Sequence, residues 1–163
     1  MIQAAKGNLL AADVEALVNA VNCVGVMGRG IALQFREAFP GNYAAYKAIC
    51  DRGELRPGKM FVFDLQCETH PRLIINFPTK RHWRDRSRLG DIQAGMVSLV
   101  EEVCQRRISS IAVPPLGCGL GGLDWEDVQP IIEGAFSKLQ GVVAMIYGPT
   151  SEPSVAARSG VGR

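Results

Sequence analysis

The sequence predicts an α/β fold in which helices cover both faces of a central sheet. Short apolar segments alternate with segments of helical periodicity along most of the 163 residues. Several of the short segments are apolar almost throughout, which is typical of strands buried on both faces. A chain of this length buries about 70% of its unfolded surface in a single core. One layered α/β sandwich, with no internal repeat, is therefore expected.

Six segments are predicted as strands because they are short, rich in β-branched or aromatic residues, and bounded by Gly, Pro or Asn. They are residues 2–7, 15–22, 60–65, 72–77, 110–116 and 142–148.

Four segments are predicted as helices from apolar residues at helical spacing. They are residues 31–39, 42–51, 89–107 and 123–141. In the last of these, Asp124 is a plausible N-cap, and Asp127 three residues later comes close to a capping-box pattern. Gly141 is expected to end this helix, and Pro130 inside it is expected to kink or split it.

Residues 1–149 are predicted to form one domain, and residues 150–163 a frayed end or the start of a linker, because they are small, polar and aperiodic. The start MIQAAKGNLL lacks the features of a secretory signal, and no apolar run reaches the roughly 20 residues of a membrane span. We expect a cytoplasmic, monomeric protein. The net charge of +2 argues against a polycation that coats nucleic acid indiscriminately.

Cysteine and histidine usage predicts neither a disulfide framework nor a metal site. The five cysteines are odd in number and scattered, with no CxxC pair, and only two histidines are present. No metal and no cofactor are expected.

Two glycine-rich turns each follow a predicted strand and precede a predicted helix. They are VGVMGRGIA (24–32) and PLGCGLGGLDW (115–125). Glycine lets the backbone approach an anion, and the N–H groups of the following helix favour negative charge. Tight turn geometry alone is the alternative explanation for either loop. Together they predict a diphosphate site, but they match neither GxxxxGK[ST] nor a dinucleotide GxGxxG, which argues against NTP hydrolysis and a Rossmann dehydrogenase.

Three linked motifs resemble the macrodomain family of ADP-ribose-binding proteins. They are GNLL (7–10), ALVNAVNCVGVMGRGIALQF (16–35) and PPLGCGLGGLDW (114–125), and the resemblance covers residues 1–149. It implies a three-layer α/β/α fold with a mixed sheet. NFPTKRHW (76–83) narrows it to the branch with terminal ADP-ribose glycohydrolase and the DarG antitoxins of DarT and DarG toxin–antitoxin pairs, which remove ADP-ribose from bases of single-stranded DNA.

The resemblance implies an ADP-ribose site with the adenine near Gly7 to Leu9, the diphosphate between the two glycine loops, and Tyr147 to Pro149 beside the adenosine. Most macrodomains have Asp where this chain has Asn8, whose amide accepts without charge assistance. The implied ligand-binding residues are Asn8, Leu9, Asn19, Gly28, Arg29, Gly30, Ile31, Ala32, Thr79, Pro115, Gly117, Cys118, Gly119, Leu120, Gly121 and Tyr147. Asn22 is expected to orient the distal ribose. Its alternative role is to close a turn at the strand end.

Lys80 is the candidate nucleophile. Sugar hydrolases commonly use two carboxylates, but NAVNCVGVMGRG contains none, and helix capping already explains Asp124. A lysine amine can attack the sugar carbon of an opened ribose and form a Schiff base. The amine must be neutral to do so, which desolvation or a neighbouring cation such as Arg81 favours. The alternative is an ordinary exposed lysine.

Residues 76–91, NFPTKRHWRDRSRLGD, also collect positive charge and aromatic side chains. This mixture is typical of surfaces that bind single-stranded nucleic acid. The predicted DNA contacts are Arg81, His82, Trp83, Arg84 and Arg86, with Arg88 beside them. Core packing is the alternative for Trp83.

The favoured function is a glycohydrolase that clears ADP-ribose from modified single-stranded DNA, opposite a DarT-like toxin as partner. Four alternatives stay open at this point. They are a binding module that reads ADP-ribose without turnover or a glycohydrolase acting on protein, a nucleic-acid-binding domain, and a cysteine hydrolase using Cys23 or Cys118.

Overall fold

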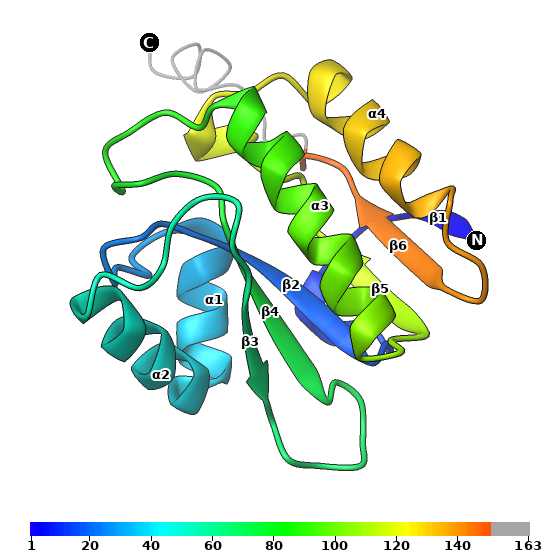
Figure 1. The fold of residues 1–163 in the computed structure, drawn as a ribbon, viewed down its shortest axis with the longest axis horizontal. Helices are drawn as coiled ribbons and strands as arrows, with labels where there is room; N and C mark the ends of the chain where they lie inside the picture. Colours follow the sequence, from blue (N-terminus) through cyan, green and yellow to red (C-terminus); the bar gives the residue numbers. More distant parts are fainter. Residues whose placement is uncertain (151–163) are drawn as a thin grey trace, which may run out of the picture.

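A computed structural model describes residues 1–150, and the predicted linker residues 151–163 lie outside this range. The described chain forms one sheet between two layers of helices (Figure 1). The strands are β1 (Ile2–Ala5), β2 (Ala16–Val21), β3 (Phe61–Asp64), β4 (Leu73–Pro78), β5 (Ser110–Val113) and β6 (Val143–Tyr147). The α-helices are α1 (Gly30–Ala38), α2 (Pro40–Asp51), α3 (Leu89–Gln105) and α4 (Trp125–Phe136), with short 3-10 turns at Leu9–Ala11 and Gly119–Gly121.

The strand order is β1-β6-β5-β2-β4-β3. All neighbouring pairs are parallel except β3 and β4, so the sheet is mixed, as the resemblance implies. The central strands β2 and β4 are buried along most of their length, which explains their continuous apolar sequences. The predicted three-layer α/β/α architecture is confirmed.

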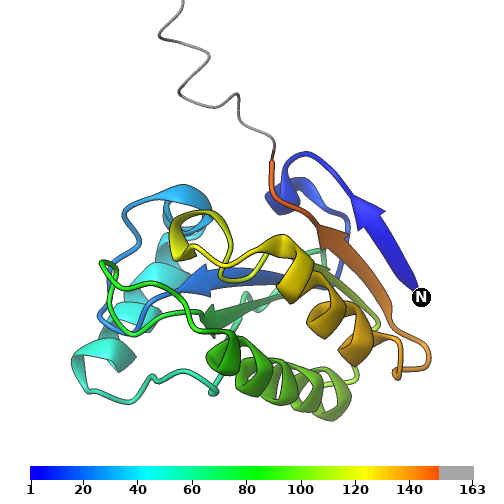
Figure 2. The ribbon, with the colours of Figure 1, turned by 90° about the horizontal axis from the view of Figure 1, so that it is seen from above.

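Each face of the sheet has its own core. On one face, α3 and α4 pack through Met96, Leu99 and Ile132 against the sheet in the largest apolar cluster. On the other face, Phe35 of α1 packs on Leu17 and Ile74, while α2 packs beside the end of β2. Figure 2, viewed from above, shows α3 and α4 on one side of the sheet and α1 on the other. Within residues 1–150, no helix is long and apolar enough to cross a membrane.

Helix α4 differs in detail from the prediction. It ends at Phe136 instead of Gly141, and it continues through Pro130 without a break. Asp124 occupies the N-cap position, but its side chain makes no capping hydrogen bond, so the capping-box prediction is wrong. The backbone N–H groups of Asp127 and Val128 instead reach the Asp124 carbonyl oxygen at 3.0 and 3.2 Å.

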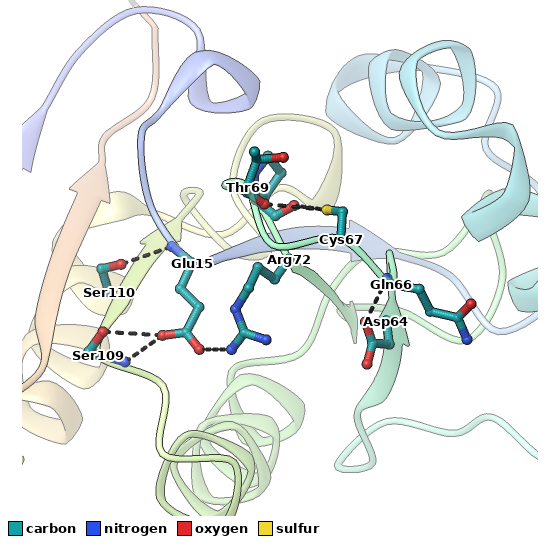
Figure 3. A network of polar contacts seen from close by, with 9 residues as sticks. Glu15, Asp64, Gln66, Cys67, Thr69, Arg72, Ser109 and Ser110 are labelled. Atoms are coloured by element: carbon teal, nitrogen blue, oxygen red, sulfur yellow. Dashed lines mark hydrogen bonds and ion pairs between the residues drawn. The ribbon is translucent and has the colours of Figure 1, made fainter.

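A buried carboxylate joins the amino ends of three strands (Figure 3). Glu15 immediately precedes β2, Arg72 precedes β4, and Ser109 precedes β5. Glu15 pairs with Arg72, and its Oε2 accepts from the Ser109 N–H at 3.0 Å and from the Ser109 hydroxyl at 3.2 Å. The Glu15 N–H in turn donates to Ser110 Oγ at 2.8 Å. We call these four residues the amino-end network.

The amino-end network determines the charge state of its central residue. Burial alone would raise the pKa of Glu15, but the hydrogen bonds from Ser109 and the ion pair with Arg72 outweigh it and hold this pKa below its ordinary value. Glu15 is therefore ionised at neutral pH and ties β2 to both of its neighbours in the sheet.

Candidate functional site

The loops that follow the parallel strands meet at the carboxyl edge of the sheet. Figure 2 shows the loops after β2, β4 and β5 gathered on the same side of the molecule. Open α/β sheets bind ligands at this edge. Both glycine-rich loops of the sequence lie here, together with the basic segment after β4.

The two glycine-rich loops approach each other. Gly30, at the start of α1, has a φ of +58°, a left-handed conformation that glycine adopts without a steric penalty. A methyl group placed on Gly30 would lie 3.7 Å from Leu120 Cδ1, which belongs to the loop after β5. Leu120 is itself 61% exposed, so its side chain stands at the mouth between the loops.

The start of α1 is suited to an anion. Arg29 occupies the N-cap position without a side-chain capping bond, and no acidic residue lies in the first turn. The first N–H groups of an α-helix have no acceptor within the helix, and here they belong to Gly30, Ile31 and Ala32. The helix dipole adds to their preference for negative charge.

The loop after β5 is fastened to the loop after β4. The Ser87 N–H donates to the Gly121 carbonyl oxygen at 2.9 Å. A methyl group on Gly121 would lie 2.4 Å from Ser87 Oγ, which is too close for any side chain. Gly121 is therefore required for the close contact between the loops, and the glycine-rich sequence has a structural reason here as well as a proposed binding role.

Asn22 and Lys80 follow two adjacent strands. Val21 of β2 is in register with Pro78 of β4. The pairing continues past the strands, because the Thr79 N–H donates to the Val21 carbonyl oxygen at 2.8 Å and the Cys23 N–H donates to the Arg81 carbonyl oxygen at 3.1 Å. Asn22 and Lys80 are thus brought to the same part of the carboxyl edge.

Both side chains make hydrogen bonds in the structure. The Asn22 amide closes the turn of residues 22–26, donating to the Val26 carbonyl oxygen at 2.8 Å. This is the turn-closing role weighed from the sequence, and the ribose contact stays a prediction. Lys80 is half-buried as a whole residue, and its Nζ donates to the Trp83 carbonyl oxygen at 3.1 Å in an exposed hydrogen bond.

Two predicted ligand contacts are inside the protein. Asn19 has no exposed surface, and its amide donates to Asn76 Oδ1 at 3.3 Å, so the predicted direct contact with a ligand is wrong. Its side chain points from the middle of β2 into the fold instead of from the strand end. Thr79 is also buried, and its hydroxyl donates to the Val21 carbonyl oxygen at 3.4 Å.

The segment after Lys80 carries an exposed aromatic and cationic stack. Trp83 is 44% exposed, so the core-packing alternative is wrong. The ring centroids of His82 and Trp83 are 5.2 Å apart, and the Arg84 guanidinium lies 4.5 Å from the Trp83 ring centroid. Arg81 differs from its neighbours because its guanidinium pairs with Asp91 at 3.0 Å.

A groove of about 1270 Å³ opens at the same edge, beside β1 and β6. Six of the predicted ligand-binding residues line it, namely Asn8, Leu9, Gly30, Ile31, Pro115 and Tyr147. The other predicted ligand-binding residues do not line the groove, and neither do Asn22 and Lys80. The groove therefore corresponds to the predicted adenosine end of the site and to the start of the diphosphate loops.

One wall of this groove consists of residues that were not predicted from the sequence. Trp125, Gln129 and Glu133 of α4 line it, together with Gln34 of α1 and Lys6. A methyl group on Gly148 would lie 3.5 Å from Trp125 Nε1, so the indole covers the chain after β6. The four-residue spacing of these three α4 residues was the available signal, since residues i and i+4 share one helix face.

The cysteine alternative has no support in the site. Burial raises the pKa of both Cys23 and Cys118 to about 11, so each thiol is protonated and a poor nucleophile at neutral pH. Among residues 1–150, no group of three or more His, Cys, Asp or Glu is arranged to hold a metal ion.

The geometry defines an α/β/α domain that offers two facing glycine loops, a helix start and a nucleotide-sized groove at one sheet edge. The sequence profile of the Macro domain matches residues 18–132. The DNA ADP-ribosyl glycohydrolase of Mycobacterium tuberculosis is 54% identical over 150 residues, which are 92% of this chain and 43% of that protein. Its counterpart from Thermus aquaticus is 50% identical over 94% of this chain and 42% of its own length. The chain belongs to the macrodomain family.

Solved structures agree with this assignment. The macrodomain of Mycobacterium tuberculosis DarG has a TM-score of 0.91 at 54% identity and covers 92% of this chain and 99% of its own. Thermosipho africanus DarTG in complex with ADP-ribose has a TM-score of 0.86 at 33% identity, over 96% of this chain and 44% of its own. This chain spans less than half the length of the DNA ADP-ribosyl glycohydrolases that it matches.

Proposed function

We propose that this domain binds ADP-ribose at the carboxyl edge of the sheet and removes it from modified thymidine bases of single-stranded DNA. The observation that carries the proposal is that Asn22 and Lys80 follow adjacent parallel strands, next to the two facing glycine loops. A diphosphate held by the loops extends its sugar toward these two residues. Residues 1–149 would form the catalytic unit.

The nature of the substrate is supported from two directions. Relatives that are 50% and 54% identical are named DNA ADP-ribosyl glycohydrolase. Beside Lys80, the exposed stack of Trp83 and Arg84 offers an aromatic face for a base and a cation for a phosphate. A relative from Thermosipho africanus joins a DNA ADP-ribosyl transferase to the glycohydrolase in one chain. The proposed partner is accordingly a DarT-like transferase whose modification this domain reverses in the cytoplasm.

Lys80 performs the proposed chemistry. Its neutral amine attacks C1 of the ribose attached to the base, the bond between C1 and the base nitrogen breaks, and the base leaves with a proton. The bond between C1 and the ring oxygen then breaks as this oxygen takes a proton from Nζ, which opens the sugar and leaves a Schiff base between Nζ and C1. Water hydrolyses the Schiff base, which returns the amine and releases ADP-ribose. For this step Nζ must leave the Trp83 carbonyl oxygen to which it now donates.

The decisive experiment replaces Lys80 with alanine. We expect Lys80→Ala to lose at least about a thousandfold in turnover on an ADP-ribosylated thymidine oligonucleotide, because the covalent route needs the amine. ADP-ribose affinity should change only a few fold, as measured by calorimetry. Lys138→Ala is the matched control, because this exposed lysine lies just after α4, away from the carboxyl edge.

Borohydride tests the intermediate directly. Reduction during turnover should attach ADP-ribose to the peptide that contains Lys80 and to no other. Parental turnover by Lys80→Ala would overturn the covalent mechanism.

A binding module without turnover is the second candidate. It is favoured by the hydrogen bonds that occupy Lys80 Nζ and the Asn22 amide. Incubation with ADP-ribosylated thymidine and guanosine oligonucleotides, and with an ADP-ribosylated protein, separates the possibilities. Release from thymidine supports the main proposal, release from protein alone supports a protein glycohydrolase, and binding without any release supports the module.

A further inference from the structure

The Asn22 side chain can form one further hydrogen bond, and only as a donor. Its Oδ1 accepts from the N–H groups of Val24 at 3.1 Å and Val26 at 3.3 Å, and the Tyr46 hydroxyl lies 2.8 Å away. An amide oxygen has two lone pairs, so these donors saturate it. The amide nitrogen carries two hydrogens, of which one goes to the Val26 carbonyl oxygen. One N–H remains.

The turn also determines which way the amide faces. If Oδ1 and Nδ2 exchanged places, the nitrogen would face the N–H groups of Val24 and Val26, and the oxygen would face a carbonyl. Both contacts would be repulsive. The turn of residues 22–26 therefore selects one orientation.

Tyr46 connects this turn to α2. Its side chain has no exposed surface, and its hydroxyl lies 2.7 Å from the backbone oxygen of Asn22 as well as 2.8 Å from Oδ1. The ring packs in an apolar cluster with Val21, Met27 and Leu55. Burial raises the pKa of Tyr46 far above its ordinary value, so the hydroxyl keeps its hydrogen and remains a donor.

We propose that Tyr46 is a positioning residue for Asn22, holding the turn so that the Asn22 amide meets the bound sugar as an N–H donor and not as an acceptor. This inference rests on the proposed function, in which Asn22 contacts the sugar attached to the base. The matching group on the ligand is then a ribose oxygen. The turn is also bonded to the segment after Lys80 through the Cys23 N–H and the Arg81 carbonyl oxygen, so its placement affects both proposed residues.

Calorimetry with two ligands separates positioning from general structural damage. ADP-ribose contains the distal ribose, whereas ADP lacks it. Tyr46→Phe keeps the ring and removes one hydrogen bond, so ADP-ribose should bind about tenfold more weakly, the size of one ordinary hydrogen bond, while ADP binding stays unchanged.

Tyr43→Phe is the matched control. Tyr43 lies one helical turn earlier on α2, where its ring receives the Arg36 guanidinium at 4.4 Å from the centroid. The affinities of this variant for both ligands should equal the parental values. Equal losses for ADP-ribose and ADP in Tyr46→Phe would indicate a structural role only and overturn the inference, as would parental affinity for both.

Asn22→Asp tests the donor directly and does not depend on the folding of Tyr46→Phe. A carboxylate can accept from Val24, Val26 and Tyr46 but has no N–H to offer, either to the sugar or to the Val26 carbonyl oxygen, so the ADP affinity of this variant reports any damage to the turn itself. We expect it to lose the preference for ADP-ribose over ADP to the same extent as Asn22→Ala. If Asn22→Asp keeps the parental preference, or if the parent itself shows none, Asn22 does not act as a donor to the sugar.

Turnover distinguishes this inference from the proposed function. If the parental protein prefers ADP-ribose but releases none from modified DNA, the glycohydrolase proposal fails while the affinity ratios still decide the role of Tyr46. If the parent is active and Tyr46→Phe keeps the parental preference and turnover, only the positioning role is overturned.

Discussion

At the amino ends of β2, β4 and β5, a buried carboxylate joins three strands, whereas at the carboxyl ends of the same strands the connections are made by backbone and amide groups. Glu15 is ionised, bonded on both sides and enclosed. At the other end, Asn22 closes a turn and backbone N–H groups of Cys23 and Ser87 link the loops. The first arrangement uses its polar groups for stability, and the second leaves some of them available to a ligand.

Within residues 1–150, none of the unsatisfied buried side-chain atoms belongs to the amino-end network. Among residues 1–150, the buried side-chain atoms without a hydrogen-bond partner are Asn19 Oδ1 and Ser87 Oγ. Asn19 lies against Met27 of the loop after β2, and Ser87 lies against Gly121 of the loop after β5. Local imperfection of this kind is expected where function constrains the sequence. Stability should therefore depend most on the amino-end network, and ligand binding most on the carboxyl edge of the sheet.

Glu15→Ala should have the largest effect on stability. It removes the partner of Arg72 and leaves the Ser109 N–H without its acceptor in this part-buried network, which costs about 3 kcal/mol of unfolding free energy. Because a domain of this size loses about 2–4 °C per kcal/mol, the melting temperature should fall by about 6–12 °C. ADP-ribose affinity of the folded variant should match the parent in calorimetry. A large loss of affinity with little loss of stability would contradict the division between the two ends.

Gly121→Ala should have the next largest effect, on ligand binding. Its methyl group would meet Ser87 Oγ at 2.4 Å, so the loop after β5 must move. We expect ADP-ribose affinity to fall about thirtyfold, equivalent to about 2 kcal/mol. Gly134→Ala is the control, because a methyl group at this α4 position meets nothing within 4 Å. Ser87→Gly in the same chain should restore part of the loss, and failure to do so would exclude this contact as the cause.

A smaller effect is expected from the exposed cations after Lys80. Arg84→Gln and Arg86→Gln should each weaken single-stranded DNA binding about fivefold, since each removes one phosphate contact. For the same reason, the slope of the logarithm of the binding constant against the logarithm of the salt concentration should become shallower by about 0.7. ADP-ribose affinity should not change. Fluorescence anisotropy across a salt series measures both quantities, with Lys138→Gln as the control. Salt-independent losses would show that these arginines act by another route.

Much of the fold could be predicted from the sequence, because strands that are buried on both faces have continuous apolar sequences. The apolar runs at 15–22 and 72–77 correspond to β2 and β4. The end of α4 was less predictable, because Gly141 is a stop signal that lies beyond the last helical residue, Phe136. Helix ends depend on local contacts that no periodicity records.

The site was predictable in its loops and less so in its side chains. Glycine spacing located Gly30, where a φ of +58° favours glycine, and Gly121, where the close contact with Ser87 requires it. In contrast, strand alternation turns Asn19 into the fold, and the NAVN motif alone does not reveal which asparagine is accessible. Tyr46 lies 24 residues from Asn22 on a separate helix, so only tertiary structure shows that the two meet.

The smallest effect should be a difference in acid sensitivity at the amino-end network. The pKa of Glu15 is lower in the folded chain than its ordinary value of 4.5. The folded state therefore binds this proton less readily than the unfolded state, so Glu15 stabilises the fold above pH 4.5 and loses this contribution as the pH falls through the lowered pKa. Glu15→Gln has no such proton to bind. Urea unfolding from pH 6 to pH 3 should show a steeper loss of stability in the parent than in Glu15→Gln, whereas parallel curves would mean that folding does not lower the pKa of Glu15.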